Sequence, residues 1–142
     1  MPTRTASATW EGTLRKGKGS FSGESGAISG EYDFGSRFEN AGGTNPEELL
    51  AAAEAACYSM ALSLALEKAG MTPERVETTA ACTLDKVGDA FRITTMKLTV
   101  RATVAEADRD AFKDIAEATK DGCPISAALL GNVHLEVDAQ LA

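Results

Sequence analysis

Three cysteines, Cys57, Cys82 and Cys123, are the side chains of this sequence best suited to nucleophilic or redox chemistry. Their number is odd, no two of them form a Cys-x-x-Cys pair, and the chain holds a single histidine, His134. This count disfavours both a structural disulfide framework and most zinc sites, which take four cysteine or histidine ligands. We therefore expect no metal at these residues.

The local sequence predicts different surroundings for the cysteines. Cys123 precedes Pro124, a pattern typical of a helix N-terminus, where the positive end of the helix dipole favours a thiolate. Cys57 lies in an apolar, alanine-rich segment, which would raise its thiol pKa. Helix dipoles alone therefore favour Cys123 as the nucleophile. Cys82, on a predicted strand among valine, threonine, alanine and leucine, is interpreted as a core residue.

Length and composition predict one globular domain. The chain has 142 residues, 44% of them hydrophobic and 25% charged, which is enough apolar material for a core. Its formal net charge of −7 makes nucleic acid a poor partner. No apolar secretory segment opens the sequence, so we expect a cytoplasmic protein with reduced cysteines. Glu54 and other polar residues interrupt the most apolar run, residues 49–66, and we predict no membrane segment.

The first third of the chain is rich in glycine and serine, which is typical of short strands joined by tight turns. We predict strands at residues 3–11, 14–22 and 27–33, within an N-terminal β region of about residues 1–43. A long helix follows within residues 44–70, because Asn45 can cap it, Pro46 suits its first position and Glu48 can close a capping box. Gly70 then ends the helix.

This central helix is apolar or small almost all the way round, so other elements must cover it. About 24 residues of helix span roughly 36 Å, more than one small chain covers on every side. We infer a partner subunit, and therefore a homodimer. Glu54 is a polar exception in the apolar stretch, and the sequence leaves open whether it is interfacial or hydrogen-bonded.

The remaining part, residues 75–142, alternates strands and helices. Period-two patterns predict an antiparallel hairpin of residues 76–84 and 91–104, with a β-bulge at Thr94 and Thr95 where the apolar phase slips. An amphipathic helix over 108–120, a short helix over 124–130 and a last strand over 133–141 follow. The whole chain, residues 1–142, is thus predicted to be a single α+β domain with antiparallel sheets.

Several segments of the sequence resemble the OsmC family and its relatives, the organic hydroperoxide resistance proteins. They are residues 35–38, the run Gly-Thr-Asn-Pro-Glu-Glu-Leu at 43–49, residues 55–57 and 60–62, and Asp-Gly-Cys-Pro-Ile-Ser at 121–126. Residues 10–12, 17–19 and 34–38 are most similar to the OsmC branch. The resemblance covers essentially the whole chain. It implies an intertwined homodimer, in which antiparallel sheets wrap around long central helices.

The resemblance also implies a thiol peroxidase. Cys57 matches the family's peroxidatic cysteine, Cys123 its resolving cysteine, and Arg37 with Glu47 the pair that activates the thiol. The chemistry is consistent: a thiolate cleaves a peroxide, and a second thiol condenses with the resulting sulfenic acid. A guanidinium held by a carboxylate lowers the pKa of a neighbouring thiol. The cycle needs no metal, haem or other cofactor.

For substrates and partners, we expect organic hydroperoxides, together with hydrogen peroxide, and a dithiol reductant. The resemblance implies a lipoylated protein as that reductant. Helix geometry adds a constraint: Glu47 and Cys57 are ten residues apart, about 15 Å along one helix, whereas an ion pair needs about 4 Å. We therefore predict that Glu47 serves Cys57 of the other subunit, and leave open which subunit supplies Arg37.

Two other functions stay open at this point. The same cysteine pair can form a disulfide switch in a redox sensor or binding module with no significant turnover. The protein can also be a structural stress protein whose cysteines are incidental. Multiple-turnover peroxide consumption separates the enzyme from both alternatives.

Overall fold

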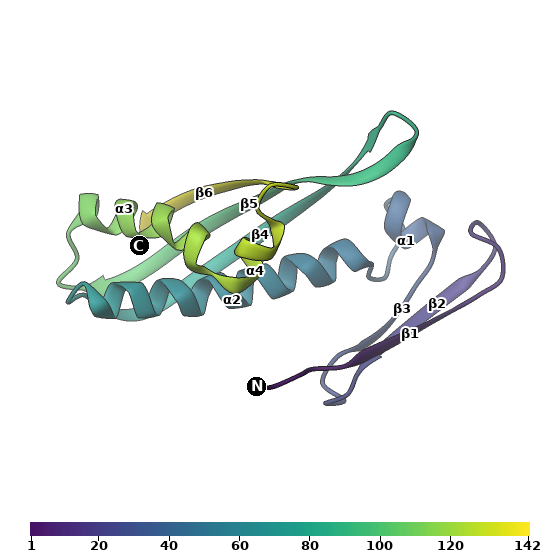
Figure 1. The fold of residues 1–142 in the computed structure, drawn as a ribbon, viewed down its shortest axis with the longest axis horizontal. Helices are drawn as coiled ribbons and strands as arrows, with labels where there is room; N and C mark the ends of the chain where they lie inside the picture. Colours follow the sequence, from purple (N-terminus) through teal and green to yellow (C-terminus); the bar gives the residue numbers. More distant parts are fainter. The chain divides into compact units, whose positions relative to one another are not determined.

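Contacts within the computed structural model, which describes residues 1–142, group the chain into two compact units, Met1–Leu49 and Leu50–Ala142. The first unit holds a small sheet and a short helix, and the second holds a larger sheet with helices (Figure 1). The α+β class predicted from the sequence is confirmed.

The first unit contains an antiparallel sheet in the order β1-β2-β3. Its strands are β1 (Ala6–Glu11), β2 (Lys18–Gly23) and β3 (Ser29–Tyr32). The predicted second strand began four residues too early, because a turn occupies that part of the chain. Gly12 has a φ of 96°, which favours glycine, and the Gly17 N–H donates to the Thr13 carbonyl at 2.7 Å.

Helix α1 (Phe34–Phe38) follows β3 and was not predicted from the sequence. Asp33 forms its N-cap: the Asp33 carboxylate accepts from the Ser36 N–H at 2.8 Å, and the Ser36 hydroxyl accepts from the Asp33 N–H at 2.9 Å. This reciprocal cap satisfies two backbone donors of a helix only five residues long. The cap therefore stabilises a helix that carries Arg37, one of the predicted site residues, in its last turn.

Helix α2 (Pro46–Lys68) is unbroken over 23 residues and begins and ends within the predicted limits. The Asn45 side chain accepts from the Glu48 N–H at 2.8 Å, as predicted. The Glu48 carboxylate instead accepts from the Thr44 hydroxyl at 2.6 Å, so the other half of the expected capping box is replaced. At the C-terminus Gly70, with a φ of 82°, stands in the left-handed position of a Schellman motif.

The second unit contains a sheet in the order β4-β5-β6, formed by β4 (Thr72–Val87), β5 (Ala90–Ala105) and β6 (His134–Leu141). The register of β4 and β5 shifts between Thr83 and Leu84, which leaves Thr94 as the extra residue and confirms the predicted bulge. The prediction that all strands pair antiparallel was wrong for β6, which runs parallel to β5. Two helices, α3 (Arg109–Gly122) and α4 (Pro124–Leu129), form the long crossover that a parallel pair requires (Figure 1).

A stripe of α2 at intervals of four residues forms part of the core of the second unit. Tyr58, Leu62 and Leu66 are fully buried on it, and they share one apolar cluster with buried residues of β5 and α3, namely Met96, Leu98, Val100, Ala102, Phe112 and Ala116. Part of α2 is not covered within one chain, since Met60 is 77% and Leu64 51% exposed. The helix therefore leaves large apolar side chains exposed within one chain.

By length and composition α2 would also suit a membrane span, with a mean hydropathy of 1.6. The central helix of a globular core has the same properties, because it too is apolar over many turns. Its packed stripe belongs to the apolar cluster that it shares with β5 and α3. We interpret α2 as a core helix.

The Tyr58 hydroxyl links α2 to α3 by donating to the Ala116 carbonyl at 2.6 Å. Burial raises the pKa of Tyr58, so the hydroxyl stays protonated and able to donate. We expect Tyr58→Phe to lower the free energy of unfolding by about 1 kcal/mol. Urea denaturation would measure this, with Tyr32→Phe, outside this core, as the control. Equal midpoints for Tyr58→Phe and wild type would contradict the assignment.

Candidate functional site

The structure brings Cys57 and Cys123 into contact. Cys57 lies in α2, Cys123 lies between α3 and α4, and their sulfur atoms are 2.9 Å apart. Both are free thiols, and the Cys123 thiol donates to the Cys57 sulfur. Cys57 is half-buried and Cys123 is fully buried. Of the two residues, Cys57 is thus the more exposed.

Cys123 stands at a junction of two helices, whereas the prediction from the sequence considered only the helix that follows it. It is the C-cap of α3 and also the N-cap of α4. Its N–H donates to the Thr119 carbonyl at 3.0 Å, and its carbonyl accepts from the Ala127 N–H at 2.8 Å. The negative end of the longer α3 dipole opposes the positive end of α4. Dipoles therefore give no clear preference for Cys123 as the nucleophile, which corrects the expectation based on α4 alone.

Burial raises the pKa of the Cys57 thiol, as its apolar surroundings predict. The hydrogen bond from Cys123 and the negative charge of Glu54 raise this pKa further, whereas the backbone N–H of Ile125 lowers it. Ile125 belongs to the first turn of α4, directly after Pro124. The surroundings of Cys57 within one chain thus oppose ionisation overall, and a nearby positive group would favour it.

Arg37 and Glu47 form an ion pair in the first unit. The Arg37 side chain donates to Glu47 Oε1 from Nη2 at 2.8 Å and from Nε at 3.1 Å, and to Oε2 from Nε at 3.3 Å. Glu47 is buried in the first turn of α2, and the guanidinium lies 5.2 Å from the centre of the Phe38 ring. Several charge-assisted hydrogen bonds fix the direction of the guanidinium. The pairing of these two residues is therefore present within one chain.

Helix α2 is unbroken between Glu47 and Cys57, as the prediction of a site shared between subunits requires. Glu47 and Cys57 are ten residues apart on it, which corresponds to about 15 Å along the helix axis. The prediction that Glu47 serves Cys57 of the other subunit therefore keeps its premise, and it stays a prediction.

Glu54 and Ser126 are site residues to which the sequence analysis gave no role. Both are fully buried, and the Ser126 hydroxyl donates to Glu54 Oε1. This resolves the open question about Glu54, which is hydrogen-bonded inside the chain. The signal in the sequence was its position three residues before Cys57, on the same side of α2. Its partner is 72 residues away and could not be named from spacing.

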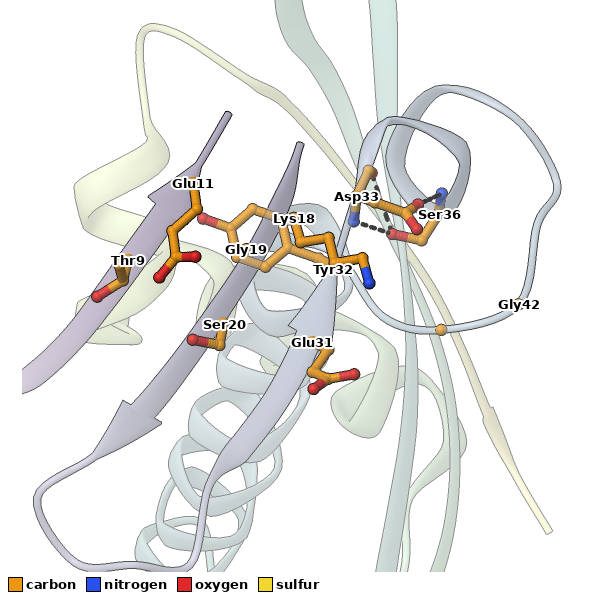
Figure 2. A pocket seen from close by; sticks show the side chains of 11 residues that line it. Thr9, Glu11, Lys18, Gly19, Ser20, Glu31, Tyr32, Asp33, Ser36 and Gly42 are labelled. Carbon is orange, nitrogen blue, oxygen red and sulfur yellow. Dashed lines mark hydrogen bonds between the residues drawn. The ribbon is translucent and has the colours of Figure 1, made fainter. Parts of the chain in front are cut away.

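Two hollows lie in the first unit. One, of about 460 Å³, is lined by polar side chains that include Glu11, Lys18, Glu31 and Asp33, and its Asp33 carboxylate caps α1 (Figure 2). The other, of about 410 Å³, is mostly apolar and includes Arg37 in its wall; its aromatic lining residues are Trp10, Tyr32, Phe34 and Phe38. The second hollow thus places apolar surface beside a guanidinium.

Comparison with known proteins assigns the chain to a family. Residues 39–138 match the family model described as OsmC-like protein. A peroxiredoxin OsmC of Escherichia coli is 47% identical over 130 residues, which cover 91% of each chain. The organic hydroperoxide resistance protein OhrB of Bacillus subtilis is 31% identical over 97 residues, 68% of this chain and 69% of that protein.

Solved structures show the same fold. The crystal structure of OhrB from Bacillus subtilis superposes with a TM-score of 0.72 at 25% identity, and covers 96% of this chain and 98% of its own. An organic hydroperoxide resistance protein from Elizabethkingia anophelis gives a TM-score of 0.76 at 23% identity, with coverage of 100% and 98%. The solved structures thus support the fold, and the matching family model and the relatives show that the chain belongs to the OsmC family.

Proposed function

We propose that this protein is a cysteine-dependent peroxidase that reduces organic hydroperoxides, and hydrogen peroxide, through a cycle of two cysteines. The observation that carries the proposal is the pair of free thiols, Cys57 and Cys123, with sulfur atoms 2.9 Å apart. The names of the relatives, peroxiredoxin and organic hydroperoxide resistance protein, support a peroxide-reducing family.

The proposed reaction begins at Cys57. Its thiolate attacks one peroxide oxygen, the O–O bond breaks, and the other oxygen takes a proton and leaves as alcohol or water. Cys57 is now a sulfenic acid. The Cys123 thiol condenses with it, so a disulfide forms and water leaves. A dithiol then reduces this disulfide by thiol–disulfide exchange and is itself oxidised, which restores both thiols. A lipoylated protein is our proposal for the reductant.

Activation of Cys57 is proposed to come from a second subunit. Burial raises the pKa of Cys57, while the Arg37–Glu47 pair offers a fixed guanidinium, and Glu47 lies about 15 Å along α2 from Cys57 of its own chain. In a homodimer of single-domain chains, the pair of one subunit can approach Cys57 of the other. The exposed Met60 and Leu64 of α2 supply apolar surface for such an interface. We place this dimer in the cytoplasm, where thiols are kept reduced.

The apolar hollow beside Arg37 supports organic hydroperoxides as the preferred substrates. Its aromatic walls can bind an alkyl or aryl group, while the guanidinium hydrogen-bonds the peroxide oxygens. Hydrogen peroxide has no such group and gains nothing from these walls. We expect a higher kcat/KM for cumene hydroperoxide than for hydrogen peroxide, by about tenfold or more. Equal values for the two substrates would contradict this role of the hollow.

The experiment that tests the proposed enzyme is steady-state peroxide consumption with dithiothreitol in excess. We expect many turnovers per protein molecule, and recovery of both free thiols when peroxide is exhausted. A rate equal to that of buffer alone, with formation of one Cys57–Cys123 disulfide per chain, would contradict the peroxidase. That outcome would favour the alternative of a redox switch without turnover.

A further inference from the structure

Glu54 is a buried carboxyl group of α2 that the proposed cycle does not use. It lies three residues before Cys57 and is fully buried. Its Oε1 accepts a hydrogen bond from the Ser126 hydroxyl, whereas its Oε2 accepts none. Burying a carboxyl group with one unpaired oxygen lowers the stability of the fold. A role of Glu54 at the site would explain why a buried carboxyl group is present there.

The hydrogen bond of Glu54 ends in the first turn of α4, where the resolving sulfur is held. Ser126 is three residues after Cys123, which caps α4, and the intervening Ile125 gives its N–H to Cys57. The Glu54–Ser126 bond thus joins α2 to α4 next to the point where Cys123 and Ile125 meet the Cys57 sulfur. Without this bond, the first turn of α4 loses a direct polar link to α2.

We propose that Glu54 is a positioning residue for disulfide formation: through Ser126 it holds the start of α4 against α2 and keeps the Cys123 sulfur within attacking distance of Cys57. The inference rests on the proposed function, because it concerns the resolving step of that cycle. It predicts that the carboxylate oxygen bound by Ser126, rather than the charge of Glu54, is what the resolving step requires.

The step can be measured without peroxide. Methyl methanethiosulfonate transfers its methylthio group to the Cys57 sulfur, and methanesulfinate leaves. The Cys123 thiolate then attacks the Cys57 sulfur of this mixed disulfide, the Cys57–Cys123 bond forms, and methanethiolate leaves. Acid quenching and mass spectrometry follow the loss of the methylthio group. A Cys82→Ser background removes the third thiol from the measurement.

We expect Ser126→Ala and Glu54→Ala to slow this intramolecular exchange by about tenfold or more, because small displacements of a reacting group are costly. Glu54→Gln should exchange at close to the wild-type rate, since its amide oxygen still accepts from Ser126. The same variant removes a negative charge near Cys57, so the pH profile of Cys57 alkylation should move to lower pH. This shift would show that the charge is gone, so a retained exchange rate in Glu54→Gln beside a slow one in Glu54→Ala assigns the effect to the oxygen that binds Ser126.

Glu67→Gln is the matched control, because it removes the same charge from an exposed position of the same helix. It should leave both the exchange rate and the pH profile unchanged. Wild-type exchange rates in Ser126→Ala and in folded Glu54→Ala would overturn the inference. If Glu54→Ala does not fold, a wild-type exchange rate in Ser126→Ala is by itself enough to overturn the inference. Slow exchange in these variants, combined with a wild type that consumes no peroxide, supports the inference and contradicts only the proposed function.

Discussion

Cys57→Ser is expected to lower peroxide consumption by at least about a thousandfold, to the rate of buffer with reductant. A serine hydroxyl is not ionised at neutral pH and cannot form the sulfenic acid on which the cycle depends. Because Cys123 is fully buried, we expect that it does not replace Cys57 as the first nucleophile. Steady-state assays with cumene hydroperoxide and dithiothreitol would measure the loss.

Cys123→Ser should give a different defect, which identifies the two roles. Cys57 should still react with peroxide, but without an adjacent thiol its sulfenic acid persists and is trapped by dimedone or oxidised further. Cys82→Ser, which changes the half-buried cysteine of β4, is the matched control and should keep wild-type turnover. A dimedone adduct on Cys123 in the Cys57→Ser variant would reverse the assignment of the two cysteines.

Local signals in the sequence predicted much of the fold that carries these cysteines. Asn45, Pro46 and Gly70 mark the ends of α2, because caps and positive φ angles are properties of a few consecutive residues. The phase slip of apolar residues located the bulge at Thr94 in the same way. Helix α1 was missed because it has a single cap and one turn, without the periodic pattern of a longer helix.

Features that depend on contacts between residues far apart in the sequence could not be predicted. The parallel pairing of β6 with β5 is set by how α3 and α4 cross the sheet, and strand periodicity is the same for both directions. The Glu54–Ser126 bond joins residues 72 apart, and the opposing α3 dipole at Cys123 appears only once both helix ends are known. The roles of Cys57 and Cys123 came from family resemblance, while the 2.9 Å contact between them came from the structure.

Arg37→Ala is expected to lower kcat/KM for peroxide by about a hundredfold, the loss typical of removing one preorganised charged donor from an active site. The burial of Cys57 raises its pKa, so the thiolate depends on a cation to offset this effect. Without Arg37 the pKa of Cys57 should rise, and the pH profile of its alkylation should move to higher pH. Arg37→Lys should be intermediate, because an ammonium keeps the charge but cannot reproduce the several hydrogen bonds to Glu47.

A mixed dimer tests whether the guanidinium crosses between subunits. Co-expressed Cys57→Ser and Arg37→Ala chains, purified through two different tags, contain one Cys57 and one Arg37 on separate chains. If each Cys57 uses the arginine of its partner, the mixed dimer has one complete site and should show about half the wild-type activity per dimer. If the arginine acts within its own chain, no site is complete, and the mixed dimer should be as inactive as either parent. The unbroken α2 favours the first result, because Glu47, which holds Arg37, and Cys57 are about 15 Å apart along this helix.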